Sequence, residues 1–169
     1  GRNAKVSGIQ LARNWDARPP SLLWRQPIGA GWSGFSAVNG FAVTMEQRGG
    51  EELVTCYQVV TGELVWTQGV ATRHATILGG VGPRSTPTIH GGKVYTLGAA
   101  GRVLCLDGSS GEILWSDNVL QRYGVDPLQD VQGVSWGRSG SPLIVDDLVV
   151  VPAGGPATGP HVSLLALDK

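Results

Sequence analysis

The sequence lacks an excess of charge of either sign. Thirteen Lys and Arg residues balance thirteen Asp and Glu residues, and charged residues make up 15% of the chain, against a usual ~25%. Proteins that bind nucleic acids normally carry a basic excess or a basic stripe. We therefore expect no nucleic-acid partner, and anionic membranes are disfavoured on the same ground.

Long apolar runs are absent as well. A membrane-spanning helix needs ~20 apolar residues, whereas the best run, PLIVDDLVVVP at 142–152, is interrupted by Asp146 and Asp147. The first fifteen residues show no charged region followed by an apolar block, so no secretory signal is visible. We expect no membrane insertion, and the compartment stays open at this stage.

Recognisable catalytic and metal-binding patterns are scarce. The three histidines, at 74, 90 and 161, do not have metal-ligand spacing, and we expect solvent-exposed or loop-stabilising roles for them. The string GGVGPRS at 79–85 lacks the Lys of a phosphate-binding loop, and no Gly-x-Ser-x-Gly occurs. These gaps favour a non-catalytic chain without deciding whether it is an enzyme.

What the sequence does contain is a repeated phrase. CYQVVTGELVW at 56–66 returns 49 positions later as CLDGSSGEILW at 105–115. A third copy of the preceding text begins at 140 with GSPLIVDDLVVV and runs to Lys169. Self-similarity at a period near 50 residues indicates a stacked repeat architecture.

Each copy has the local chemistry of four short strands. Runs rich in β-branched and aromatic residues alternate with turn pairs such as Asn39-Gly40 and Gly91-Gly92. In the middle copy we predict strands at 85–90, 93–97, 102–107 and 113–116. Copies must stack because one such sheet cannot cover both of its faces. A two-sheet sandwich is the alternative, but the period and the terminal Trp favour a propeller.

We therefore predict an all-β fold, a partial β-propeller of four-stranded antiparallel blades. Whole blades span about 32–68 and 84–117, and an incomplete blade spans 138–169. Residues 21–27, with Trp24, form the last strand of a preceding blade, and 1–20 are a lead-in. The chain is thus a fragment whose open flanks would drive self-association.

The repeated phrase also predicts how blades are joined. Trp66 and Trp115 close the last strand of each copy, where an indole can wedge between sheets. The turn before each Trp supplies a hydroxyl, a glycine and an acceptor. The predicted joint residues are Thr61, Gly62, Trp66, Asp107, Ser110, Gly111 and Trp115.

The two cysteines occupy the same slot in successive copies. Cys56 and Cys105 should therefore lie on equivalent strands of neighbouring sheets, ~10 Å apart. A disulfide fails when the two Cα atoms are more than ~7 Å apart. We predict that both are small buried hydrophobic residues.

These phrases resemble the Ala-x-Asp-x-x-Thr-Gly-x-x-x-Trp motif of pyrroloquinoline quinone (PQQ) enzyme-like repeats. Cys56 and Cys105 replace the Ala, and Gln58 departs from the Asp. The resemblance implies an eight-bladed ring and a periplasmic or otherwise exported protein. It favours an uncharacterised, non-catalytic branch that acts as a binding or assembly scaffold with no cofactor. Part of a PQQ-dependent dehydrogenase, with PQQ and calcium, and an extracellular sensor domain are the alternatives.

One rim of the predicted propeller carries the candidate binding residues. Trp32, Arg84, Trp136 and Arg138 stand just before the first strand of each blade. Aromatic rings and guanidinium groups there can hold a flat, anionic ligand. Alternatively, the arginines bind carbonyls of the next blade and the tryptophans fill the gap. The protein or small-molecule partner is unknown, and one helical turn is expected within 116–125.

Overall fold

The computed structural model describes residues 7–156 and 158–169, and it confirms an all-β chain built as a partial β-propeller. The first blade is a four-stranded antiparallel sheet in chain order. Its strands are β1 (Ser36–Val38), β2 (Phe41–Arg48), β3 (Glu51–Gln58) and β4 (Leu64–Ala71).

The second blade repeats this arrangement with β7 (Thr88–His90), β8 (Lys93–Leu97), β9 (Arg102–Asp107) and β10 (Ile113–Asn118). Its two middle strands have the predicted bounds. The first strand begins at Thr88 instead of Ser85, immediately after Pro87, which has no N–H to give to a sheet ladder. The third blade has three strands, β11 (Leu143–Val145), β12 (Leu148–Gly154) and β13 (Val162–Asp168).

The two-residue turns have the backbone geometry that tight hairpins require. Asn39 and Gly40 join β1 to β2 with φ values of 50° and 83°, and Gly91 and Gly92 join β7 to β8 with 57° and 76°. Positive φ at both central residues matches the right-handed twist of the flanking strands. These short turns keep each blade a compact meander.

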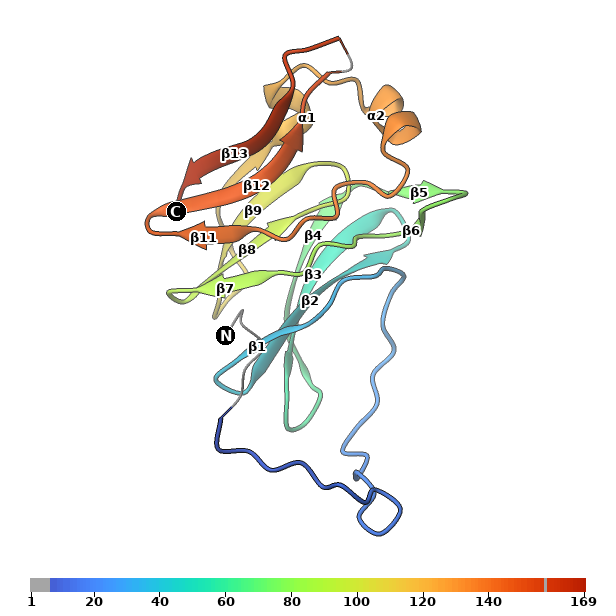
Figure 1. The fold of residues 1–169 in the computed structure, drawn as a ribbon, viewed down its shortest axis with the longest axis vertical. Coiled ribbons are helices and arrows are strands. Elements are labelled where there is room, and N and C mark those ends of the chain that lie inside the picture. The colour runs from blue at the N-terminus through green and yellow to red at the C-terminus, as the bar shows by residue number, and fades with distance from the viewer. Residues whose placement is uncertain (1–6, 157) are drawn as a thin grey trace.

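The second blade lies between the first and the third, as Figure 1 shows. Two apolar cores fill the spaces between the sheets. Because side chains alternate along a strand, Val94, Leu104 and Leu106 pack with the first blade. On the other face of the same sheet, Tyr95, Leu97, Val103 and Cys105 pack with Val149, Val151 and Ala153 of the third blade.

One predicted strand is not formed. Residues 21–27 make no sheet ladder, and the nearest pairing is an isolated bridge between Ala30 and Gln47. We call residues 24–30 the N-terminal strap. Two hydrogen bonds, Ala30 N–H to the Gln47 carbonyl at 3.0 Å and the reverse at 2.7 Å, tie its end to β2.

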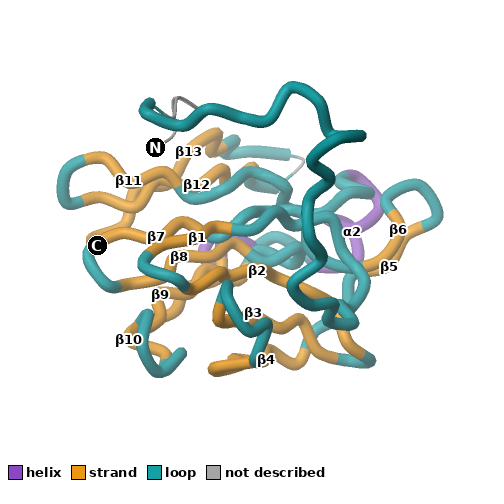
Figure 2. Tube along the Cα trace, turned by 90° about the horizontal axis from the view of Figure 1, so that it is seen from below, coloured by secondary structure: helices purple, strands orange, loops and turns teal. Residues whose placement is uncertain are grey.

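The loops that connect the blades contain structure of their own. A two-stranded hairpin, β5 (Ala75–Thr76) and β6 (Gly80–Val81), follows the first blade. Two short helices, α1 (Val119–Arg122) and α2 (Pro127–Gly133), follow the second. Figure 2 shows β5, β6 and α2 at one end of the molecule, which we call the loop rim.

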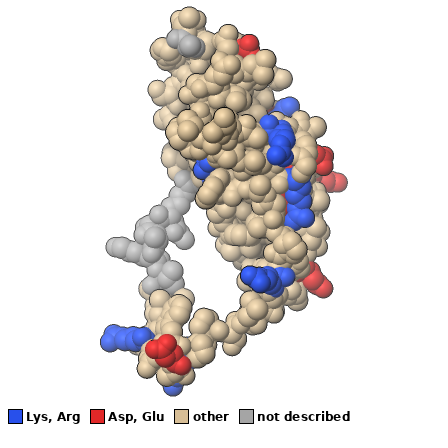
Figure 3. Space-filling view, turned by 90° about the vertical axis from the view of Figure 1, so that its right-hand side faces the viewer, with Lys and Arg blue, Asp and Glu red and all other residues tan. Residues whose placement is uncertain are grey.

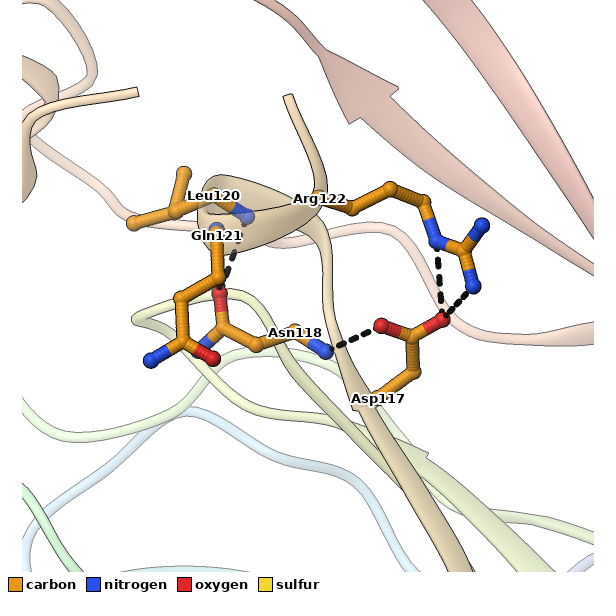
Figure 4. A network of polar contacts seen from close by, with 5 residues as sticks. All are labelled: Asp117, Asn118, Leu120, Gln121 and Arg122. Atoms are coloured by element: carbon orange, nitrogen blue, oxygen red, sulfur yellow. Dashed lines mark hydrogen bonds and ion pairs between the residues drawn. The ribbon is translucent and has the colours of Figure 1, made fainter. Parts of the chain in front are cut away.

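The helix α1 confirms the helical turn expected within 116–125. The side chain of Asn118 caps it by accepting hydrogen bonds from the N–H groups of Leu120 at 2.9 Å and Gln121 at 3.1 Å (Figure 4). Arg122 closes the turn against Asp117, with Nε 2.9 Å from Oδ2. Val119 and Leu120 then enter the core between the second and third blades. No helix within 7–156 and 158–169 is long and apolar enough to span a bilayer.

Candidate functional site

The contact between Trp66 and Gly111 joins the first blade to the second. Trp66 ends the phrase on β4 and is buried, and its indole Nε1–H donates to the Gly108 carbonyl at 3.1 Å. A Cβ placed on Gly111 would lie 2.6 Å from Cε3 of the indole. The ring therefore lies directly on the glycine backbone of the next blade, and only glycine permits that approach.

The strap repeats this contact on the other side of the first blade. Trp24 donates its Nε1–H to the Val59 carbonyl at 2.8 Å, and a Cβ on Gly62 would lie 2.5 Å from its ring. In both contacts the acceptor stands three positions before the glycine. Trp24 thus occupies the predicted slot of a blade Trp although no strand carries it.

Trp115 occupies the corresponding slot of the second blade. It is half-buried and packs against the core shared with the third blade. Its ring centroid is 6.2 Å from that of Tyr95, at an interplanar angle of 49°.

The polar members of the phrase bond within their own turns. Thr61 Oγ1 and Ser110 Oγ each accept the N–H of the Glu two positions on, both at 3.2 Å. Asp107 Oδ1 accepts the N–H groups of Ser109 at 2.9 Å and Ser110 at 3.0 Å. The Ser109 hydroxyl and these N–H groups lower the pKa of Asp107 to about 2. The turn residues therefore shape the loop that presents the glycine.

A second set of inter-blade contacts runs along the inner strands. The hydroxyl of Ser36 donates to the Pro87 carbonyl, and that of Thr88 donates to the Pro142 carbonyl, both at 2.5 Å. Two positions earlier, Gly34 N–H donates to Thr86 Oγ1 at 3.0 Å. Thr86 N–H then donates to Ser141 Oγ at 3.0 Å. We call this set the hydroxyl ladder.

The hydroxyl ladder was not predicted from the sequence, although the sequence contains a signal for it. Every copy opens with Ser or Thr, and a hydroxyl can both donate and accept. The ladder borders a groove of about 710 Å³ between the inner strands of the first two blades. It fixes the spacing of the blades near the propeller axis.

Glu52 links the first two blades through a buried carboxylate. It extends from β3, and its Oε2 accepts the N–H of Ala99, in the turn between β8 and β9, at 3.0 Å. A Cβ on Gly98 would lie 2.2 Å from Oε1, so the carboxylate needs the glycine beside it. Burial raises the pKa of Glu52, and the Ala99 N–H offsets part of that rise.

Both cysteines are free and buried, as predicted. Burial raises the pKa of the Cys56 thiol and of the Cys105 thiol. A thiol that resists ionisation is a poor nucleophile and metal ligand. Both act as core residues.

The structure brings two of the four predicted rim residues into contact. The Arg84 guanidinium carbon lies over the Trp32 ring, 5.2 Å from its centroid. Arg84 Nη2 also donates to the Gly79 carbonyl in the loop between β5 and β6. The ring of Trp32 remains largely exposed.

Arg138 has a different environment. It is buried, and its Nη2 lies 2.5 Å from Oδ1 of Asp130, which is buried on α2. This ion pair fastens the long loop between the second and third blades. Trp136 stands nearby in sequence but is exposed.

Histidine 74 is buried and stabilises the loop rim. Its Nε2 lies 3.0 Å from the Ser135 carbonyl, and Thr76 Oγ1 donates to the same oxygen at 2.6 Å. The loop after the first blade is thereby tied to the loop after the second. Within 7–156 and 158–169, no group of three His, Cys, Asp or Glu side chains is placed to hold a metal.

PQQ, the cofactor that the resemblance raises, fits these rim residues poorly. It is flat and carries acidic groups, so it needs accessible guanidinium groups beside a free ring face. Arg138 is already paired with Asp130, and Arg84 already binds Gly79 and lies over one face of Trp32.

The strap covers an apolar pocket. A cavity of about 320 Å³ is lined by residues of the strap and of the first blade: Trp24, Arg25, Gln26, Pro27, Ile28, Phe35 and Tyr57. The fully buried carboxylate of Glu46 holds the strap in place. It binds the Gly29 N–H, Arg48 Nε at 3.0 Å and the Tyr57 hydroxyl at 3.3 Å.

Solved structures share this arrangement of blades at low sequence identity. The quinohemoprotein alcohol dehydrogenase of Comamonas testosteroni matches 83% of this chain at 20% identity and a TM-score of 0.60. The quinohemoprotein alcohol dehydrogenase ADHIIG of Pseudomonas putida HK5 matches 86% at 20% identity and 0.57. In both cases this chain spans 20% of the dehydrogenase.

BamB from Moraxella catarrhalis matches 81% of the chain at 14% identity and a TM-score of 0.50, over 49% of its own length. These likenesses show the fold alone. No curated protein matches the sequence at a significant level. A family model described as outer membrane protein assembly factor BamB matches residues 11–168. The chain therefore belongs to the BamB family of PQQ-like repeat β-propellers.

Proposed function

We propose that the chain is a non-catalytic propeller segment that acts as a binding and assembly scaffold. The observation that carries this proposal is the engagement of its polar side chains in joining blades and loops. The hydroxyl ladder and Glu52 link neighbouring blades. The Arg138–Asp130 pair fastens a loop. These polar side chains therefore hold the fold together and are not free to act on a substrate.

The pocket beside the strap is the binding feature of this scaffold. Its volume of about 320 Å³ lies at the lower end of ligand pockets, which run from roughly 300 to 1,000 Å³. Aromatic and aliphatic side chains make up most of its lining, together with Arg25 and Gln26. A pocket of this size and character accepts an apolar side chain of a protein partner. Export to the periplasm, the setting that the family suggests, belongs to the same proposal.

Two measurements test the proposal. A photo-crosslinking residue at Ile28, in the pocket, should give a discrete adduct in cells, whereas one at the exposed Val60 should not. Adding PQQ and Ca²⁺ to the purified protein should produce neither a cofactor spectrum nor dye-linked alcohol oxidation. Oxidation in that assay would replace the scaffold with the dehydrogenase alternative.

A further inference from the structure

The hairpin of β5 and β6 holds two large aliphatic side chains out in solvent. Ile77 is 102% exposed and Leu78 is 72% exposed, at the tip of the loop between the strands. Figure 1 shows this hairpin projecting beyond the sheets on the right. A contiguous exposed apolar patch that is rimmed by polar residues marks an interaction site.

The base of the hairpin is firmly anchored. Thr76 Oγ1 donates to the Ser135 carbonyl at 2.6 Å and accepts the Gly79 N–H at 2.8 Å. A Cβ on Gly79 would lie 2.2 Å from the Ser135 carbonyl oxygen, so the two loops are in close contact. The tip is therefore held outward by its base.

Two exposed tryptophans flank this base. Trp32, 67% exposed, has its Nε1 3.7 Å from a Cβ placed on Gly80. Trp136, 52% exposed, follows Ser135 directly. An indole combines an apolar body with a polar N–H, and tryptophan is enriched at the boundary between lipid and water.

The segment that carries the hairpin has basic residues only. Residues 72–84 contain Arg73 and Arg84 and no acidic residue. Arg73 is exposed and donates from Nη1 to the Gly49 carbonyl at 2.8 Å. Figure 3 looks onto the side from which the hairpin projects. It shows Lys and Arg atoms mostly along the right-hand side of the main body, with Asp and Glu atoms beside them at the right-hand edge.

We propose that the hairpin is a peripheral membrane contact. Ile77 and Leu78 enter the interfacial layer of an anionic bilayer, Trp32 and Trp136 lie at its boundary, and Arg73 faces the lipid phosphates. A projecting apolar tip can enter the boundary between headgroups and acyl chains, as the apolar face of an interfacial helix does. Basic side chains near an anionic surface add attraction. The balanced charge of the whole chain disfavours anionic membranes, but the hairpin departs locally from that balance.

This inference does not depend on the proposed scaffold function, because it concerns a different surface. The pocket beside the strap and the hairpin share none of their lining residues. Either proposal can therefore fail while the other stands.

Vesicle co-sedimentation tests the contact. The protein is mixed with vesicles of phosphatidylcholine and phosphatidylglycerol at 3:1, and with vesicles of phosphatidylcholine alone, at physiological salt. We expect binding to the anionic vesicles, and the double variant Ile77→Ser/Leu78→Ser should weaken it at least about tenfold. The matched control is Leu22→Ser/Leu23→Ser, an adjacent pair of 81% and 76% exposure just before the strap, which should bind as the wild type does.

Tryptophan quenching supplies a second readout that reports position. Lipids with brominated acyl chains should quench the fluorescence of the bound protein. Compared at equal bound fractions, the Trp32→Phe/Trp136→Phe variant should lose most of that quenching, whereas Trp15→Phe, at another exposed Trp, should keep it. Circular dichroism of each variant confirms that it is folded.

Three results would overturn the proposal. The first is failure of the wild type to bind anionic vesicles. The second is undiminished binding by Ile77→Ser/Leu78→Ser. The third is association of the protein without lipid that this variant abolishes, which would make the tip a contact between copies of the chain.

Discussion

The indole of Trp66 rests on Gly111 of the next blade, so close that a Cβ there would lie 2.6 Å from the ring. Trp24 rests on Gly62 in the same way, at 2.5 Å. The first and second blades are thus each contacted in the same way, by a Trp that precedes the blade in the chain and lies on a glycine of the blade. The repeated phrase of the sequence encodes this joint.

Truncating Trp66 should destabilise the fold severely. Trp66 is 8% exposed and belongs to the core between the first two blades, so Trp66→Ala should cost about 3–5 kcal/mol of the free energy of unfolding. Trp115→Ala should cost less, because Trp115 is only half-buried. Urea denaturation followed by circular dichroism measures both. If both variants lost less than ~0.5 kcal/mol of unfolding free energy, as surface changes typically do, the two tryptophans would not join the blades.

Adding a methyl group at Gly111 should be costly for two separable reasons. Its φ of 76° disfavours any Cβ, and the Trp66 ring occupies the space that a Cβ needs. Gly91→Ala is the matched control, since Gly91 also has positive φ but no atom within 4 Å of its Cβ position. Gly111→Ala should lose about 1–3 kcal/mol more than the control. Equal losses of stability in Gly111→Ala and Gly91→Ala would mean that the Trp66 ring moves aside at no cost.

Glu52 should make stability depend on pH. Burial raises its pKa in the folded state, so folding favours the protonated carboxyl. Its contribution is fully present below the unfolded-state pKa and is lost as the pH rises through the folded-state pKa. Denaturation from pH 4 to pH 8 should therefore show a slope that Glu52→Gln removes.

The exposed Glu112 supplies the control for that experiment, and Glu112→Gln should keep the wild-type slope. A Glu52→Gln protein whose stability still falls in parallel with the wild type would show that another group titrates.

The third blade should mediate self-association. Leu164 is 65% exposed on β13, whose neighbouring Leu165 packs inward on the core. Charge placed on that outer face should oppose burial against another sheet. We expect Leu164→Glu to shift sedimentation velocity profiles towards the monomer. The exposed Val60→Glu should leave them unchanged.

The repeat made the blades predictable from the sequence. Strand alternation and glycine turns located β8 and β9 residue for residue, because both follow from local chemistry. The segment at 21–27 was predicted as a strand from Trp24, but no sheet ladder forms there. Trp24 still contacts Gly62 as a blade Trp would, because that contact does not require Trp24 to lie on a paired strand.

The loop rim was less predictable, because its geometry arises from contacts between distant loops. The hairpin at 75–81 and the Arg138–Asp130 pair depend on partners outside the repeat. The same holds for Glu46 and Glu52, whose burial follows from the strap and from the neighbouring blade. Hydrophobic periodicity carries no information about such contacts.

A double-mutant cycle between Trp24 and Gly62 tests the joint most directly, because Trp24 lies outside both buried cores. Gly62→Ala should be strongly destabilising in the wild type. In the Trp24→Ala background it should cost no more than Gly91→Ala does. A coupling free energy above about 1 kcal/mol is the predicted result, and strictly additive losses would contradict the account.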